Sequence, residues 1–275
     1  MDNKQVKVVN WNVEGLKGAM SSLAENIFSD YDVCILTETF MTAESRFEVK
    51  GFYNIHALAR KEDRGRPSGG VTYLIKSKLT PFEILLIEED QLVIKTRIGI
   101  VVGVYYRPDC SAADIVDSIQ RAIGIIQTNE RVILAGDLNC PADKNNRKTK
   151  IVLEYIEEEG LTLANDRKEL TYICHNGGSA IDLTFVRGLE ISKHSLLTNS
   201  EAAIIRKHVP VTTILKVTKP TEKPIKAERL QRRLDPSILR EGVDKTVCIL
   251  QAINEGRLDE AMSEITEYIK GGIVT

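Results

Sequence analysis

Several apolar runs of this sequence end directly at a carboxylate, an amide or an imidazole. Four runs end this way: Val8-Val9 before Asn10-Trp11-Asn12-Val13-Glu14, Val33–Leu36 before Thr37-Glu38, Val102–Val104 before Tyr105–Asp109, and Val132–Ala135 before Gly136-Asp137-Leu138-Asn139. Two more have the polar residue at their start: Asp182 in the run at Ile181, and His208 before the run at Val209. Side chains at strand ends are held rigidly and still reach solvent, so sites are commonly built there. These strand ends therefore predict one pocket that gathers several oxygen ligands and one imidazole.

The types of these ligands indicate the chemistry. Carboxylate and amide oxygens suit a hard cation such as Mg²⁺, which keeps waters and binds through one or two carboxylates plus a substrate phosphate. No thiolate or multi-histidine pattern for zinc is present. A hard cation, a few carboxylates and one histidine can hydrolyse a phosphodiester. Taken singly, Glu14 or Glu38 is more commonly a turn or surface residue, so the prediction depends on the whole group.

The elements that must position these residues are short strands and a few helices. Strands are predicted at Val6–Val9, Val33–Leu36, Val71–Ile75, Glu83–Ile87, Leu92–Arg97, Ile100–Tyr106, Val132–Ala135, Ile181–Val186 and Val209–Val217, and helices at Leu16–Phe28, from Ser111 to about Gln127, and at Lys148–Glu158. The strands predicted within residues 71–106 have no helix-length segment between them. A parallel crossover needs such a segment, so we expect these strands to be antiparallel neighbours. Many strands with intermittent helices predict a layered α/β sandwich with mixed sheets.

Length and composition set wider limits. The 275 residues carry 37 Lys+Arg and 39 Asp+Glu, for a formal charge of −2, and 43% are hydrophobic. This is ordinary for a globular protein and leaves a local basic groove for nucleic acid open. The five scattered cysteines form no CxxC pair, and no secretory signal precedes the first strand. We therefore expect an intracellular protein that is not secreted.

The composition changes near Lys219. Residues 219–233 combine prolines with an excess of basic residues, which favours an extended linker. Two helical patterns follow, around Pro236–Glu255 and Leu258–Ile269. We predict one domain over 1–217 and a basic linker and helical tail over 218–275.

The order of the motifs resembles the endonuclease/exonuclease/phosphatase superfamily. The matching motifs are Trp11-Asn12-Val13-Glu14-Gly15-Leu16, Leu36-Thr37-Glu38-Thr39, Ser68-Gly69-Gly70-Val71, Tyr105-Tyr106-Arg107-Pro108-Asp109, Gly136-Asp137-Leu138-Asn139, Ser179-Ala180-Ile181-Asp182 and His208-Val209-Pro210-Val211. Within the superfamily the sequence is most similar to the endonuclease domain of non-LTR (LINE-type) retrotransposons. The resemblance implies a deoxyribonuclease-like, four-layered sandwich of two mixed β-sheets flanked by helices.

The resemblance also implies roles for individual residues. Glu38 would be the principal Mg²⁺ ligand, assisted by Asn12 and Glu14, with Mn²⁺ as a possible substitute ion. Asp137 would align or activate the attacking water, Asn139 would hold a phosphate oxygen, and Tyr106 would place a hydroxyl near the phosphate. His208, oriented by Asp182, would donate to the scissile phosphate, and Asp109 would be a further substrate contact. The implied reaction nicks DNA and leaves a 3′-hydroxyl and a 5′-phosphate.

One residue departs from the family pattern. The family usually has Ser-Asp-His where this chain has Arg206-Lys207-His208, so Lys207 replaces a carboxylate of the metal region. A unit charge at about 4 Å is worth about 4 kcal/mol at an effective dielectric of 20, enough to weaken cation binding. Alternatively, Lys207 points outward to a DNA phosphate.

Three kinds of function therefore stay open. The leading interpretation is a nuclear, Mg²⁺-dependent DNA endonuclease, which would be joined in a longer polyprotein to a reverse transcriptase region. The second is another enzyme with the same fold, either an abasic-site nuclease, a phosphatase or an RNA deadenylase. The third is a catalytically impaired module that binds nucleic acid or protein, for which Lys207 is the motive.

Overall fold

A computed structural model describes residues 5–16, 27–61, 65–127, 130–198 and 206–217. The chain divides into two units, Met1–Thr221 and Glu222–Thr275, and the described residues belong to the first. The predicted linker and helical tail over 218–275, and with them the boundary near residue 217, lie outside the described residues and stay predictions. None of the helices within the described ranges is long and apolar enough to cross a membrane.

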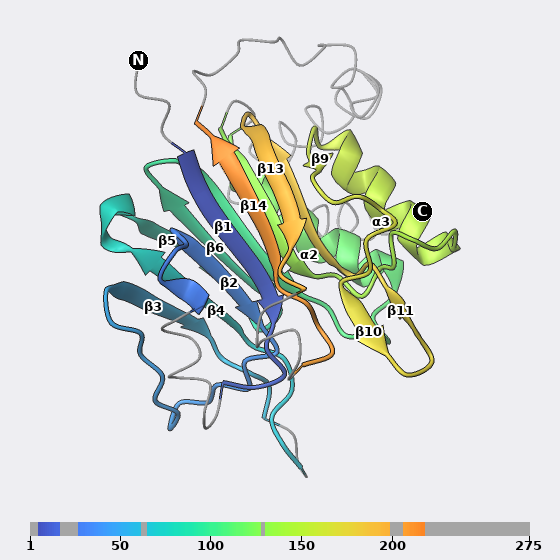
Figure 1. Cartoon of the computed structure of the whole chain (residues 1–275), viewed down its shortest axis with the longest axis horizontal. Coiled ribbons are helices and arrows are strands. Elements are labelled where there is room, and N and C mark those ends of the chain that lie inside the picture. Colours follow the sequence, from blue (N-terminus) through green and yellow to red (C-terminus); the bar gives the residue numbers. More distant parts are fainter. Residues whose placement is uncertain (1–4, 17–26, 62–64, 128–129, 199–205, 218–275) are drawn as a thin grey trace, which may run out of the picture. The chain divides into compact units, whose positions relative to one another are not determined.

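Two six-stranded sheets form the body of the domain (Figure 1). The first sheet has the order β13 (Glu190–Leu196), β14 (Val211–Lys216), β1 (Gln5–Asn12), β2 (Val33–Thr37), β4 (Val71–Lys76) and β3 (Phe52–Ala57). The second has the order β5 (Glu83–Ile87), β6 (Gln91–Thr96), β7 (Gly99–Tyr105), β8 (Val132–Asp137), β12 (Asp182–Arg187) and β9 (Thr162–Leu163). Each sheet contains one parallel pair, β1 with β2 and β7 with β8, among antiparallel ones. The predicted mixed sheets are thus confirmed.

Apolar side chains fill the space between the sheets and cover both outer faces. Val8, Ile35 and Tyr73 of the first sheet pack with Val101 and Ile133 of the second. Helices α2 (Ala112–Gly124) and α3 (Arg147–Glu158) cover the outer face of the second sheet with a separate apolar cluster. A third cluster, which contains Trp11 and Phe28, lies on the outer face of the first sheet. The predicted sandwich with flanking helices is confirmed, although most of the helix expected at Leu16–Phe28 falls on residues 17–26, outside the described ones.

The start of α2 follows the predicted local chemistry. The Ser111 hydroxyl accepts the backbone N–H of Asp114, and the Asp114 carboxylate accepts the backbone N–H of Ser111. This reciprocal capping box satisfies donors that the first helical turn leaves open.

Other elements differ from the prediction. Strand β4 does not continue into β5 but belongs to the first sheet, whereas β5, β6 and β7 are antiparallel neighbours as expected. The edge strands β3 and β13, and a small hairpin of β10 (Tyr172–Cys174) and β11 (Gly177–Ser179), were not predicted. Their part-exposed, mixed sequences lack a clean apolar alternation.

Candidate active site

The register of the strands brings the predicted site residues to one end of the sandwich. Asp182 lies directly opposite Asp137 in the antiparallel pair of β12 and β8, and Tyr105 lies opposite Asp137 in the parallel pair of β7 and β8. From the other sheet, the Asn12 amide N–H donates to Asp137 Oδ2 at 2.9 Å. Because side chains alternate along a strand, Asn12 and the two aspartates all face the space between the sheets.

Asp137, Asp182 and His208 form a compact buried cluster. One potential ligand atom from each lies within 4.8 Å of the others. Among the described residues, these three are the His, Cys, Asp or Glu side chains that lie close enough together to hold a metal ion. The His208 Nδ1 lies 2.8 Å from Asp182 Oδ2. The exposed fractions of the three residues are 1%, 0% and 5%, so this part of the site is nearly sealed from solvent by its own neighbours.

Contacts from three distant segments fix His208. The Trp11 indole N–H donates to the His208 carbonyl at 2.9 Å, and the Tyr172 ring lies 4.9 Å from the imidazole ring. A β-bridge also joins Tyr172 to His208. These contacts and the hydrogen bond to Asp182 hold the imidazole in one orientation, with Nδ1 on Asp182 and Nε2 as the ring nitrogen on the opposite side.

The ionisation of the cluster follows from burial and charge. Burial alone would lower the pKa of His208, but the charge of Asp182 and its hydrogen bond raise that pKa to about 9. Burial, and after it the charge of Asp182, raises the pKa of Asp137 to about 8, against hydrogen bonds from Asn12 and the Asn139 backbone. His208 is thus a charged donor at neutral pH, and a cation beside Asp137 would favour its carboxylate form.

Three further candidate residues of the site lie on strained backbone. Glu14, Glu38 and Asn139 have φ angles of 47°, 49° and 47°, in the left-handed region that non-glycine residues rarely adopt. Each lies one or two residues beyond the end of a strand that belongs to a parallel pair, β1, β2 or β8. Such strain persists only where the surroundings enforce it, and it gathers at functional sites.

Glu38 and Glu14 are linked to the cluster through neighbours. The Tyr105 hydroxyl donates to Glu38 Oε1 at 2.6 Å. Burial, with the hydrogen bond and charge of Glu38 and the charge of Asp137, raises the pKa of Tyr105, so the phenol stays a donor. The Glu14 carboxylate lies 3.5 Å from the backbone nitrogen of Lys207, and the Glu14 N–H donates to Asn12 Oδ1. Both glutamate side chains are partly exposed.

Tyr106 does not take the place predicted for it. Its side chain is 2% exposed, belongs to the cluster under α2, and donates its hydroxyl to Ser118 at 3.1 Å. The neighbouring Tyr105 is the tyrosine that points into the site. Strand alternation could have shown this, because Val101 and Tyr105 share the inner face of β7 while Val102, Val104 and Tyr106 share the outer face.

The structure places the other candidates around the cluster. The Asn139 amide donates to the Tyr106 carbonyl at 2.7 Å, and its backbone N–H donates to Asp137 Oδ1 at 3.0 Å. Asp109 lies outside the cluster, with a side chain that is 77% exposed and 3.6 Å from Arg107. Lys207 has an exposed side chain, and its carbonyl accepts the N–H of Ile173.

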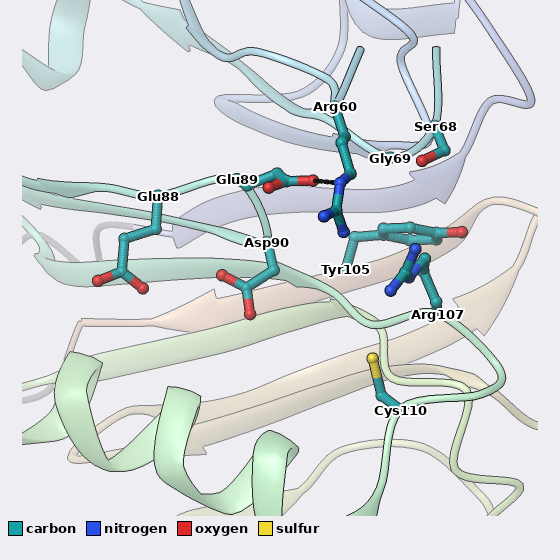
Figure 2. Close-up of a pocket in the computed structure, with 9 residues that line it drawn as sticks. All are labelled: Arg60, Ser68, Gly69, Glu88, Glu89, Asp90, Tyr105, Arg107 and Cys110. Atoms are coloured by element: carbon teal, nitrogen blue, oxygen red, sulfur yellow. Dashed lines mark ion pairs between the residues drawn. The ribbon is translucent and has the colours of Figure 1, made fainter. Parts of the chain in front are cut away.

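Tyr105 also lines a pocket of about 340 Å³ beside the site. Figure 2 shows Tyr105 in its wall together with Arg60 and Arg107, opposite the carboxylates of residues 88–90. Arg60 pairs with Glu89 at 3.7 Å. The pocket therefore mixes both signs of charge.

The two mixed sheets, with a histidine–aspartate pair and an amide-held aspartate at their strand ends, define the endonuclease/exonuclease/phosphatase fold. The resemblance predicted from the ordered motifs is confirmed, and the chain is similar to proteins of non-LTR retrotransposons. Residues 99–211 match the family described as endonuclease-reverse transcriptase. The chain is 25% identical, over 290 aligned residues, to the RNA-directed DNA polymerase from mobile element jockey of Drosophila melanogaster. The alignment covers 96% of the chain but only 29% of that relative.

Solved structures with this fold include nucleases and a phosphatase. The endonuclease domain of TRAS1, a telomere-specific non-LTR retrotransposon, aligns with a TM-score of 0.60 at 14% identity, over 78% of this chain and all of that domain. The AP endonuclease LMAP from Leishmania major aligns with a TM-score of 0.62 at 14% identity, over 78% of this chain and 88% of its own. The 3′ phosphatase NExo from Neisseria, bound to a product DNA hairpin, aligns with a TM-score of 0.57 at 16% identity, over 76% and 98%. These likenesses show the fold and leave the reaction and its substrate open.

Proposed function

We propose that this chain is a Mg²⁺-dependent DNA endonuclease of the retrotransposon type, which nicks one strand and leaves a 3′-hydroxyl and a 5′-phosphate. The buried cluster of Asp137, Asp182 and His208 carries the proposal. It places a charged imidazole beside an aspartate whose two oxygens are held by amides. Such an arrangement can stabilise charge on a phosphate and orient a water.

The donors at the strand ends fit a hard cation. Glu38 offers a carboxylate of which one oxygen holds the Tyr105 hydroxyl, and Asp182 Oδ1 is buried without a hydrogen-bond partner in the described structure. Glu38, with Asn12 and Glu14, would hold Mg²⁺, or Mn²⁺ in its place. The ion would supply charge neutralisation at the phosphate.

The protein's own groups would perform the remaining steps. Asp137 orients the attacking water and accepts its proton as the water oxygen bonds to phosphorus. The bond from phosphorus to the 3′ oxygen breaks, and that oxygen takes a proton from solvent to become the 3′-hydroxyl. His208 donates from Nε2 to a phosphate oxygen while Asp182 stabilises the imidazolium, and Asn139 holds a second phosphate oxygen. Because the Lys207 side chain is exposed rather than buried in the cluster, we favour an active enzyme over an impaired copy. We further propose that the chain acts in the nucleus, next to a reverse transcriptase region of a longer protein.

A plasmid assay tests this function. Supercoiled plasmid with Mg²⁺ should be converted to the nicked circle, and DNA ligase should reseal it because the ends are 3′-hydroxyl and 5′-phosphate. Asp137→Ala and His208→Ala should each slow nicking about 100-fold to 10,000-fold, the range of general acid–base catalysis. Asp117→Ala, an exposed aspartate of α2, is the control that should keep full activity.

The alternatives give different outcomes of the same assay. If wild type and the two variants show one common background, the enzymatic proposal fails and a binding module is favoured. Faster turnover of an abasic-site duplex or of a 3′-phosphate end would instead indicate abasic-site nuclease or phosphatase activity on this fold.

A further inference from the structure

Four cations gather around the start of α3. Residues 143–150 contain Asp143 and four basic residues, Lys144, Arg147, Lys148 and Lys150, which we name the α3 cationic cluster. Asn146 caps the helix by accepting the N–H of Thr149, and the first turn holds no acidic residue. Cations are unfavourable at a helix N-terminus, where the helix dipole is positive. This arrangement therefore works against the stability of the helix.

The partners of these cations are mostly neutral. Lys144 donates to the Ser179 hydroxyl at 2.9 Å, and Lys148 donates to the Pro108 carbonyl at 3.1 Å. Lys150 lies 3.8 Å from Glu154, but both side chains are more than half exposed, so this pair is weak. Among the described residues, Arg147 is exposed and has no carboxylate partner. The positive charge of the cluster is thus largely uncompensated.

A hollow beside the cluster contains an unpartnered polar group. It encloses about 420 Å³. Its charged lining residues are the cations Lys144, Lys150 and Arg167 and the carboxylates Asp143, Glu154 and Glu157, and Asn145, Asn146 and Thr149 add polar groups. Thr149 is only 4% exposed, and its hydroxyl oxygen has no hydrogen-bond partner in the described structure. An anion with several acceptor oxygens would satisfy this hydroxyl together with the surrounding cations.

The cluster borders the candidate active site on two sides. Asp143 accepts the backbone N–H of Ala180 at 2.8 Å, two residues before Asp182. Lys148 contacts the loop that follows Tyr105. Neither hollow is purely cationic, because the pocket on the Arg60 side holds three carboxylates against two guanidinium groups (Figure 2) and the hollow beside α3 holds three carboxylates against three cations. The excess of positive charge lies instead on the side chains of the α3 cationic cluster.

We propose that the α3 cationic cluster binds backbone phosphates of duplex DNA beside the nicked bond. The inference rests on the proposed function for its ligand, because a strand whose phosphate reaches His208 must continue past one side of the site. The contacts would position DNA without reading its sequence.

Salt-dependent binding tests this surface without using catalysis. Binding of a 20-base-pair duplex is measured in EDTA over a range of salt concentrations. The triple variant Lys144→Gln, Arg147→Gln and Lys150→Gln should flatten the slope of log affinity against log salt by roughly 2 to 3, at about 0.9 per lost phosphate contact. Arg147→Gln alone should flatten it by about 0.9.

A control with the same change of net charge separates a local contact from a general effect. Lys50→Gln, Arg97→Gln and Lys193→Gln remove three exposed cations elsewhere on the domain and should leave the slope within about 0.5 of wild type, less than one contact. Thermal unfolding of the α3 variant should be unchanged or shifted upward, since it removes cations from a helix N-terminus.

Equal slopes for the two triple variants, or no duplex binding by wild type, would overturn the inference. If the wild type binds with the expected slope but does not nick, the inference holds while the proposed nuclease function fails.

Discussion

The two halves of the candidate site are built differently. The half that comes from the second sheet and the His208 segment is buried, and Asp137, Asp182 and His208 each make at least one hydrogen bond. The half from the first sheet presents Glu14 and Glu38 on left-handed backbone, with partly exposed side chains. One half is buried and hydrogen-bonded, and the other has left-handed backbone and partly exposed side chains.

This difference matches the tasks proposed for the two halves. A charge that must stay oriented benefits from burial and fixed hydrogen bonds, because these cost no reorganisation when the reaction occurs. A cation and a phosphate must enter and leave, and Mg²⁺ keeps waters, so its ligands need access to solvent. The comparison predicts that the halves can be disabled separately.

The largest effect should come from breaking the buried half. Asp182→Asn keeps the shape but removes the charge that sustains the imidazolium, so burial should bring the pKa of His208 from about 9 to 6.5 or below. Nicking should fall about 1,000-fold, within the range of general acid–base catalysis. NMR titration of the imidazole in metal-free protein measures the pKa directly.

The same pair predicts a change of stability with pH. The folded-state pKa of His208 lies above its ordinary value of 6.5, so the pair stabilises the fold fully below pH 6.5 and loses this effect as pH rises through about 9. Asp182→Asn should flatten the unfolding free energy over that window, whereas the exposed Asp166→Asn should not. An unaltered His208 titration in Asp182→Asn would contradict this account.

The open half should respond to loss of its main carboxylate. Glu38→Gln should weaken Mg²⁺ binding, measured by calorimetry, by about 100-fold or more, since a unit charge near a divalent ion is worth several kcal/mol. The pKa of His208 should stay well above 6.5, because Asp182 is its main partner. Asp182→Asn should in turn retain most of the Mg²⁺ affinity. If both variants lose ion binding and the histidine shift together, the halves are not separate.

Local rules predicted the fold and the gathering of the site well. The strand ends at Asn12 and Asp137 and the strand start at Asp182 do meet. The antiparallel register places Asp182 opposite Asp137, and Asn12 reaches Asp137 from the other sheet. The capping chemistry at Ser111 also predicted where α2 begins. Both inferences need only short-range pattern and the geometry of a sheet.

What the sequence did not reveal depends on long-range contacts and on exact alternation. The indole of Trp11 fixes the carbonyl of His208 from 197 positions away, and no local pattern encodes that pairing. The hairpin strand that places Tyr172 against the imidazole is too short and exposed to show a period. Tyr106 was chosen by its motif position, whereas Tyr105 faces the site because of its place in the strand.

The adjacent tyrosines provide a matched pair that sharpens the comparison. Tyr105→Phe should weaken Mg²⁺ binding about 10-fold, the lower end for loss of a hydrogen bond that orients a ligand. Tyr106→Phe should leave Mg²⁺ affinity unchanged and cost about 1 kcal/mol of stability through its lost bond to Ser118. The reverse pattern in calorimetry and thermal unfolding would restore Tyr106 as the tyrosine of the site.

The smallest effect should come from Asp109, which belongs to neither half. Its carboxylate is mostly exposed and pairs with Arg107 at the surface, and such pairs contribute about 1 kcal/mol or less. Asp109→Asn should therefore change the rate of plasmid nicking less than about 3-fold, and Mg²⁺ affinity not at all. Because the amide keeps the size of the side chain, a fall of 10-fold or more would mean that the carboxylate itself touches the substrate. The site would then extend beyond the strand ends onto the loop after β7.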